Sequence, residues 1–355
     1  MSQNWMRHFE LQLVDENGQG IELSDFKVTF TIDWFNISSA SRVGTFKIYN
    51  LSADTVNRIT GQEFSKVRLI AGYDGIAPEV SASDVGTVRE VDAADVAQSD
   101  GRNYGLIFSG EIRYSVTGKH SPIDTYVLIQ AADTDLAFAT SITNQTLAAG
   151  YTTEDMFRLL MKDFEAKGAT VGRTPVFPPT VFPRGRALFG MTRHLMDSVA
   201  AQCGATWQFV DGQLNMLPEG EYMHDAIVLN SATGLIGMPQ QTIGNGVNVR
   251  ALINPNIRVN GLIQLDQASV YRTALSNNDI AMAGGRITDQ NTDGNITLSG
   301  TTAQPASIAT DGVYVVKGIM YTGDTRGQAW YMDMMCEARG AADLRSASSL
   351  QREVG

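Results

Sequence analysis

The chain has 355 residues and a formal net charge of -11 at pH 7, with 27 Lys and Arg against 38 Asp and Glu. This length predicts two or three domains with a sizeable core. The acidic balance argues against tight nucleic-acid binding, because phosphate recognition needs clustered Lys and Arg. No apolar run reaches membrane-spanning length and the N-terminus has no signal pattern, so we expect a soluble protein made in the cytoplasm.

The first third of the chain alternates in hydrophobicity with the period of two that β-strands show. The clearest example is a strand pair at 106–114 and 126–129, joined by a polar turn. Ile107 falls on the less buried face of this pair, opposite the inward residues Leu106, Phe108, Gly110, Ile112 and Tyr114. A short helix capped by Ser52 is also predicted. Further strands are expected at 9–14, 26–35, 45–49 and 67–71.

Two long polar insertions interrupt the pattern, at 74–103 and 267–311. Within the first, residues 79–100 hold six acidic residues against one Arg. That composition predicts a solvated loop or, alternatively, a docking loop for a partner. Residues 341–355 are polar and weakly patterned, which predicts a loose tail or a segment ordered only by a partner.

The middle of the chain changes to the helical period of 3.6. Thr152 is an N-cap, apolar residues follow at helical spacing, and Gly168 ends the predicted helix. A second helix is predicted at 187–202. Two short strands then flank Asp211-Gly212, a two-residue turn signal. Residues 148–224 are therefore predicted to form an α-α-β-β module.

The second half repeats the first in the type and order of its strands. Predicted strands at 247–252, 262–265, 313–321 and 330–336 match those of the first half, with an insertion at the same point. The triplets Ile112-Arg-Tyr114 and Ile319-Met-Tyr321 are matched to each other. We interpret this as one β-unit used twice. The alternative is that any two β-domains look somewhat alike.

The predicted fold class is mainly β (α+β). It consists of two tube-like antiparallel β-barrel units related by internal duplication, with the α-α-β-β module between them. The domains are expected at 1–147, 148–224 and 225–340, followed by the tail at 341–355.

Motifs for catalysis or metal binding are not found. Asp133-Thr-Asp135 follows a strand directly, where Asp commonly makes turns and caps, so a catalytic carboxylate pair is not expected. Residues 289–300 begin like a calcium loop, but Gly300 stands where a bidentate Glu is needed. We predict no catalytic, cofactor or metal site, and buried free thiols at Cys203 and Cys336. No second ligand at zinc spacing accompanies any of the four histidines, His8, His120, His194 and His224.

Several segments together resemble the baseplate hub proteins of contractile-tailed bacteriophages. The resemblance covers nearly the whole chain, and its motifs are structural rather than catalytic. The insertions at 79–100 and 267–311 depart from it and leave the contacts of those loops undefined. The segments that carry it are 44–52, 66–73, 107–112, Trp207 with Asp211-Gly212, and 318–337.

The resemblance implies a structural virion protein rather than an enzyme. Two tube-like barrels per chain and three chains per ring would place six similar barrels around a DNA channel, adapting a threefold central spike to the sixfold tail tube. The implied partners are two further copies of the chain, the spike, the tail tube or its initiator, and tape measure and baseplate wedge proteins. Specific nucleic-acid binding, membrane insertion and a cofactor are not implied. The implied location is the tail baseplate of a virion assembled in the host cytoplasm.

Two alternatives stay open. The hub of a related contractile injection or secretion machine belongs to the same structural class. A tail-associated peptidoglycan hydrolase belongs to a different class, and it would need a paired acid and nucleophile or a metal site.

Overall fold

The structure is a computed structural model, and it describes residues 6–36, 41–74, 103–231, 233–241, 246–265, 288–292, 295–299 and 312–339. The acidic insertion at 79–100 and the tail at 341–355 lie outside the described residues. Of the second insertion only β17 (Thr288–Thr292) and β18 (Asn295–Ser299) are described, and they pair antiparallel. The segment that begins like a calcium loop therefore contains a hairpin, and the absence of calcium there stays a prediction.

The first β-unit is built from strands with inside–outside alternation. Every second residue is buried in β3 (Val28–Phe35) and in β4 (Val43–Tyr49), so each strand presents one apolar face to a core. Between β4 and β5 lies α1 (Ala53–Thr60), which Ser52 caps as predicted by accepting from the Thr55 N–H. The remaining strands are β1 (Arg7–Val14), β2 (Gly20–Glu22), β5 (Lys66–Tyr73), β6 (Asn103–Lys119) and β7 (Thr125–Ala132).

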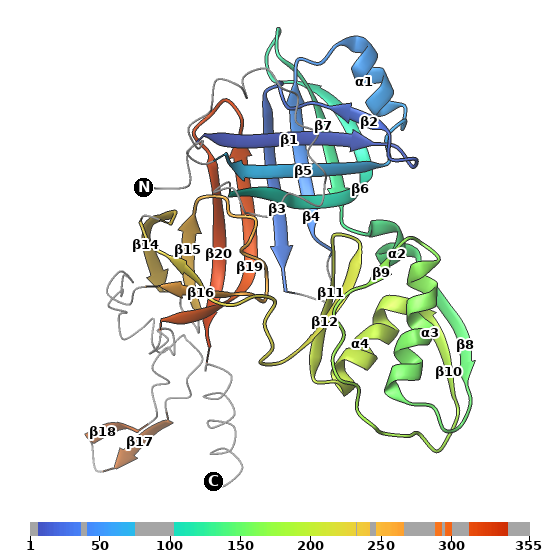
Figure 1. Cartoon of the computed structure of the whole chain (residues 1–355). Helices are drawn as coiled ribbons and strands as arrows, with labels where there is room; N and C mark the ends of the chain where they lie inside the picture. The colour runs from blue at the N-terminus through green and yellow to red at the C-terminus, as the bar shows by residue number, and fades with distance from the viewer. Residues whose placement is uncertain are drawn as a thin grey trace, which may run out of the picture.

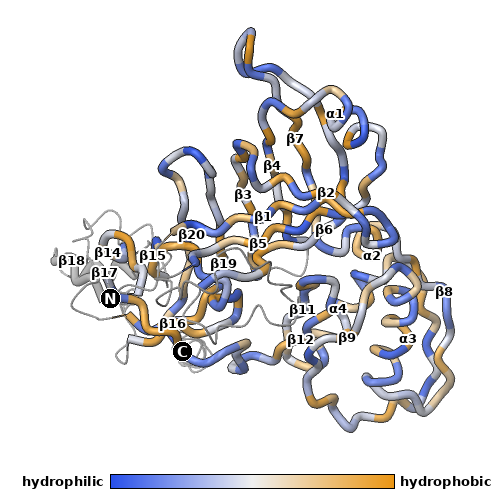
Figure 2. The backbone as a smooth tube through the Cα atoms, turned by 45° about the horizontal axis from the view of Figure 1, so that its top comes forward, coloured by the Kyte–Doolittle hydropathy of each residue, from blue (hydrophilic) through white to orange (hydrophobic). Residues whose placement is uncertain are grey.

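Two layers of strands face each other in this unit. β1, β2 and β5 form one layer and cross the strands β3, β4 and β7 of the other (Figure 1). The long strand β6 belongs to both layers, because it pairs with β5 up to Glu111 and with β7 from Glu111 onward. Apolar residues are concentrated along these strands, whereas the turns between them are largely hydrophilic (Figure 2). Buried side chains such as Phe46, Leu69 and Ile129 fill the space between the layers.

One residue of β6 breaks the predicted alternation. Leu69 pairs with Phe108 and Ile70 pairs with Leu106, so Ile107 is an extra residue in the ladder. Ile107 and Phe108 are consequently both buried, at 2% and 0% exposure. The prediction that Ile107 lies on a less buried face is wrong.

The middle module begins with the predicted helix. In α3 (Thr153–Glu165) the Thr152 hydroxyl accepts from the Asp155 N–H, and the Asp155 carboxylate accepts from the Thr152 N–H. The predicted hairpin consists of β11 (Ala205–Val210) and β12 (Gln213–Pro218). The other elements are α2 (Asp135–Thr140), β8 (Ile142–Leu147), β9 (Thr170–Val171), β10 (Arg186–Met191) and α4 (Thr192–Gln202).

The helix predicted over 187–202 is wrong at its N-terminal end, which belongs to β10. That strand pairs antiparallel with β8, with Leu188 opposite Gln145. This pairing between distant segments outweighs the helical spacing of the apolar residues. The rest of the prediction is confirmed by α4, which places Met196 and Val199 in the module's core with Trp207.

The second β-unit contains all the strands predicted for it. Two further strands, β13 and β14, precede them and were not predicted. The strands are β13 (Ile227–Leu229), β14 (Leu235–Gln241), β15 (Gly246–Ala251), β16 (Leu262–Leu265), β19 (Val313–Asp324) and β20 (Trp330–Ala338).

The order of strand pairing is the same in the two units. The run β5-β6-β7-β4-β3 corresponds to β16-β19-β20-β15-β14, and every neighbouring pair in both runs is antiparallel. This confirms the predicted repeat of strand order. The units differ at the next strand, because β1 is antiparallel to β5 whereas β13 is parallel to β16.

An irregularity at the same step fixes how the units align. In its pairing with β7, β6 has one extra residue, Arg113, directly after Ile112. In its pairing with β20, β19 has one extra residue, Lys317, directly after Val316. Ile112 therefore corresponds to Val316. The predicted match of Ile112 with Ile319 is wrong by the three residues that separate Val316 from Ile319.

β3 and β19 join the two units edge to edge, a contact that the sequence did not indicate. They pair antiparallel from Phe35 opposite Gly318 to Thr29 opposite Asp324. Eight strands thus run side by side in the order β14-β15-β20-β19-β3-β4-β7-β6. One apolar core includes residues of both units, and a second lies within the middle module. The domain boundaries at 147 and 224 stay a prediction.

Candidate assembly surfaces

One face of the eight-strand run is covered and the other, called the bare face below, is open. On β3 the side chains of Phe30 and Ile32 are buried in the core, whereas Thr31 and Asp33 alternate with them on the opposite side and are exposed. The bare face continues across the joint, because Asp33 pairs with Met320 of β19. The layer of β1, β2 and β5 lies on the other side of the sheet (Figure 1).

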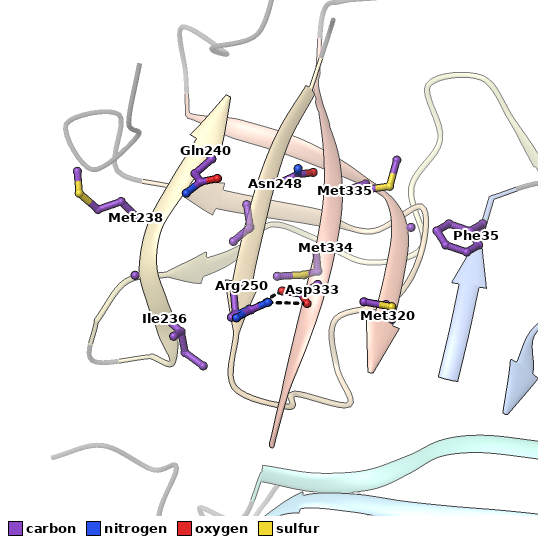
Figure 3. Close-up of a pocket in the computed structure, with 13 residues that line it drawn as sticks. Phe35, Ile236, Met238, Gln240, Asn248, Arg250, Met320, Asp333, Met334 and Met335 are labelled. Carbon is purple, nitrogen blue, oxygen red and sulfur yellow. Dashed lines mark hydrogen bonds and ion pairs between the residues drawn. The ribbon is translucent and has the colours of Figure 1, made fainter. Parts of the chain in front are cut away.

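A groove lies on the bare face of the second unit. Its volume is about 690 Å³. Methionines from three strands line it, and Met238 and Met335 are 57% and 56% exposed. Figure 3 shows Met320 and Phe35 at one end of the groove and Met238 at the other. Exposed methionines are adaptable contact residues, because the side chain is flexible and polarizable.

An ion pair lies among these methionines. Arg250 Nε lies 2.6 Å from Asp333 Oδ1, and its Nη2 lies 3.0 Å from Oδ2, so the two side chains form a two-pronged contact (Figure 3). The Arg250 guanidinium also lies 4.2 Å from the centre of the Tyr331 ring. The charge of Arg250 is thereby balanced within the groove.

The first unit carries a related contact at the corresponding position. Counted from the shared irregularity, Lys47 corresponds to Arg250 and Tyr126 to Tyr331. Lys47 Nζ lies 4.6 Å from the centre of the Tyr126 ring. Asp333 corresponds to Leu128, so the second unit adds a carboxylate that the first unit lacks. The repeat thus extends from strand order to one specific side-chain contact.

The eight-strand run has an edge without a strand partner at each of its two ends, as far as the described residues go. β14 pairs with β15 along one edge only. β6 pairs with β7 along one edge, and along the other it pairs with β5 only as far as Glu111. Exposed apolar side chains accompany both edges, since Tyr114 and Val116 on β6 are 46% and 52% exposed and Ile236 on β14 is 36% exposed. Unpaired strand edges are templates for pairing with another chain.

A buried ion cluster connects the module to both β-units. Asp133, at the end of the first unit, accepts from the backbone N–H groups of Asp211 and Gly212 in the hairpin turn, at 2.7 and 3.1 Å. Arg42 contacts the carboxylates of both Asp133 and Asp211. From the second unit, Arg258 Nη1 lies 3.3 Å from Asp211 Oδ2. The turn of one hairpin is therefore held between two units.

The charges in this cluster act on each other through a low-dielectric surrounding. Burial raises the pKa of Asp133, against the opposing charge of Arg42. Burial acts in the same direction on Asp211, but the charges of Arg42 and Arg258 outweigh it, so the pKa of Asp211 lies below its ordinary value. Both carboxylates are thus bound to positive charge in the folded state.

The residues considered for chemistry are not brought together. Asp133 is held in the ion cluster, while Asp135 pairs with Arg113 at 2.6 Å. Cys336 is buried and Cys203 is half-buried, and both are free thiols, so the prediction of two buried cysteines holds only for Cys336. Within the described ranges, no three His, Cys, Asp or Glu side chains are placed to hold a metal ion. No helix in the described part of the chain is long and apolar enough to span a membrane.

Comparison with known proteins identifies the fold. No protein-family model and no curated protein matches the chain. A tail protein from Neisseria meningitidis MC58 aligns over 95% of this chain and 98% of its own, with a TM-score of 0.52 and 8% identity. The 43 kDa tail protein of prophage MuSo2 from Shewanella oneidensis aligns over 94% and 98%, with a TM-score of 0.52 and 7% identity. The chain shares the fold of these tail proteins almost from end to end, which confirms the predicted mainly β fold class.

Proposed function

We propose that this chain is a structural protein of a phage tail, and that it acts as a baseplate hub. Three copies would form a ring that joins a threefold central spike to the sixfold tail tube. The observation that supports this most is the repeat of strand order in two units that are already joined edge to edge by β3 and β19. The fold shared with two tail proteins over nearly the whole chain supports the setting.

The symmetry argument rests on the two units within one chain. A threefold spike and a sixfold tube cannot make identical contacts with one set of subunits. A cyclic trimer of a chain with two similar units has six similar units around its axis, while its sequence repeats only three times. Such a ring offers nearly sixfold backbone geometry on one side and threefold side-chain geometry on the other.

The bare face is the proposed wall of the channel. The opposite face is covered by the second strand layer. That layer would lie on the outside of the ring, where the circumference is larger. Several charges on the bare face are paired, as Arg250 is with Asp333 and Lys317 with Glu337. Such pairing reduces the number of free cations that a passing DNA duplex could bind, which favours sliding over sticking.

The alternatives differ in what supports them. The hub of a contractile injection or secretion machine would use the same ring, and only its biological setting differs. A peptidoglycan hydrolase would need an accessible acid and nucleophile. Asp133 is not available for that role, because its side chain is 1% exposed and is bound by Arg42.

Electron microscopy of the purified protein, alone and with the spike protein of the same tail, tests the proposal. We expect threefold rings with six similar lobes around a central opening. Particles without a ring in both samples would contradict the hub function. Cell-wall lysis that a single Asp or Glu substitution abolishes would support the hydrolase instead.

A further inference from the structure

The joint between β3 and β19 provides a template for a second joint. β3 lies along an edge of β19 that β16 has already partly used, since β16 pairs with 313–315 and β3 pairs with 318–324. β20 occupies the other edge of β19. In the joint, the edge of β3 in the run β3-β4-β7-β6 lies against β19 of the run β14-β15-β20-β19. The contact uses the part of β19 that β16 leaves unpaired.

The repeat gives both sides of this joint a counterpart. β14 corresponds to β3, because each pairs with the strand that precedes the connection to β16 or β5. The second half of β6 corresponds to the part of β19 that receives β3. The alignment is supported by one backbone bond in each unit: Ile112 donates to Ser65 O at 2.8 Å, and Val316 donates to Gly261 O at 3.0 Å. Beyond this bond β19 continues into its joint with β3, whereas β6 has no strand on that edge in the described part of the chain.

These two counterpart edges lie at opposite ends of the eight-strand run, which begins with β14 and ends with β6. We infer that β14 of one copy pairs antiparallel with the second half of β6 in a second copy, in the register that β3 and β19 use. The inference deepens the proposed ring and rests on it. Pairing of this head-to-tail kind closes into a ring when the rotation fits. Three copies would then contribute all their eight-strand runs to one continuous sheet.

The register follows from the joint within the chain. Thr322 pairs with Thr31, and these positions correspond to Gly118 on β6 and Gln240 on β14. Gly118 of one copy therefore lies opposite Gln240 of the next. Pro239 has no N–H to donate, so the ladder skips that residue. It lies where β14 already departs from regular pairing with β15.

The side chains along both edges fit a contact between copies. β14 has no charged residue, and its edge is interrupted only by Pro239 and by the irregularity between Ile236 and Gln240. Backbone pairing with a second copy is therefore confined to the residues on either side of that irregularity. Apolar residues are exposed beside both edges, with Val116 on β6 and Met238 on β14 each more than half exposed. Pairing the edges would remove part of this apolar surface from water. The Met-lined groove would then continue from one copy toward the next along the bare face.

Disulfide cross-linking of the full-length protein tests the register. Gly118→Cys and Gln240→Cys are combined in a Cys203→Ser background, and the matched control is Thr31→Cys with Thr322→Cys. The Tyr126 ring has to turn aside for a side chain at 118, since it lies closer to the position of an added Cβ than van der Waals contact allows. After mild oxidation we expect covalent dimers and trimers from the test variant. The control should give monomers whose mass is lower by the two hydrogens lost in one disulfide.

Cross-strand Cβ atoms lie about 4.5–5.5 Å apart, slightly more than a disulfide prefers. A short bismaleimide reagent is therefore applied to the same variants, and the control pair shows whether the reagent spans this geometry. Rings in solution without cross-links at 118 and 240 would overturn the strand assignment and leave the hub function standing. Monomers without cross-links, both alone and with the spike protein present, would overturn both. Mixing the two single-Cys variants should give covalent dimers only.

Discussion

Arg42 and Asp133 form an ion pair that is almost completely withdrawn from water. Arg42 Nη2 lies 3.0 Å from Asp133 Oδ2, and each side chain is 1% exposed. The Arg42 guanidinium also lies over the rings of Trp34 and Phe108, 5.0 and 5.3 Å from their centres. Because Asp133 also binds the hairpin turn of the module, this pair fixes the module's position relative to the sheet.

Removing Asp133 should be costly because it leaves Arg42 buried with less opposing charge. We expect Asp133→Ala to lower the free energy of unfolding by about 3–5 kcal/mol, the range for breaking a buried pair from one side. Glu154→Ala, which removes the exposed pair with Arg158, should cost less than about 1 kcal/mol. Urea unfolding measures both, and equal losses would contradict a structural role for the cluster.

The joint between the units depends on a residue without a side chain. A Cβ at Gly318 would lie 2.6 Å from Cδ1 of the Phe35 ring, so Gly318→Val should displace that ring and destabilise the joint. Phe35→Ala removes the obstacle. The double variant should therefore be more stable than the sum of the single changes predicts, by about 0.5–3 kcal/mol, the usual coupling of residues in contact. Simple additivity in thermal unfolding would show that the two residues do not meet.

The buried tyrosine of β19 makes stability depend on alkaline pH. Burial raises the pKa of Tyr321 from 10.0 to about 12. The unfolded chain then loses this proton at a lower pH than the folded chain, so the contribution of Tyr321 to stability is constant below pH 10 and falls between pH 10 and 12. Two pKa units correspond to a loss of about 2.7 kcal/mol. Tyr321→Phe should remove about this much of the alkaline loss of stability and leave the part due to Tyr73, whose pKa burial also raises to about 12. An unchanged profile would contradict the assignment.

The two cysteines should differ in reactivity. Burial raises the pKa of both thiols, but Cys336 is 3% exposed and lies inside β20, whereas Cys203 is half-buried at the end of α4. We expect a maleimide to label Cys203 first and Cys336 only as the protein unfolds. Mass spectrometry follows both sites. Equal labelling rates in the native protein, or a disulfide between the two, would contradict the described packing.

Local signals in the sequence predicted the elements whose cause is local. The N-cap at Thr152 and the Asp211-Gly212 turn lie where they were expected, because a side-chain cap and a positive φ are decided within a few residues. The strands of both units were located for the same reason, because alternation of apolar and polar residues is a local signal. The extra residue at Ile107 was missed, since a bulge depends on the partner strand and leaves no mark on hydrophobicity.

Contacts between distant segments account for the remaining differences. The start of the second predicted helix became β10 because β8, more than 40 residues earlier, pairs with it. The ion cluster gathers Arg42, Asp133, Asp211 and Arg258 from three parts of the chain. Because these four charged residues lie far apart in the sequence, their spacing gave no sign that they cluster. The β3–β19 joint was hidden in the same way, although the repeat itself contained the information needed to place its counterpart.

The molar mass of the purified protein in solution tests the central claim most directly. Sedimentation equilibrium over a concentration series up to tens of micromolar, with and without the spike protein, gives that mass without assumptions about shape. A hub predicts a species of three times the 38.5 kDa chain, formed by the protein alone or on the spike. A chain that stays at 38.5 kDa in both series would contradict it.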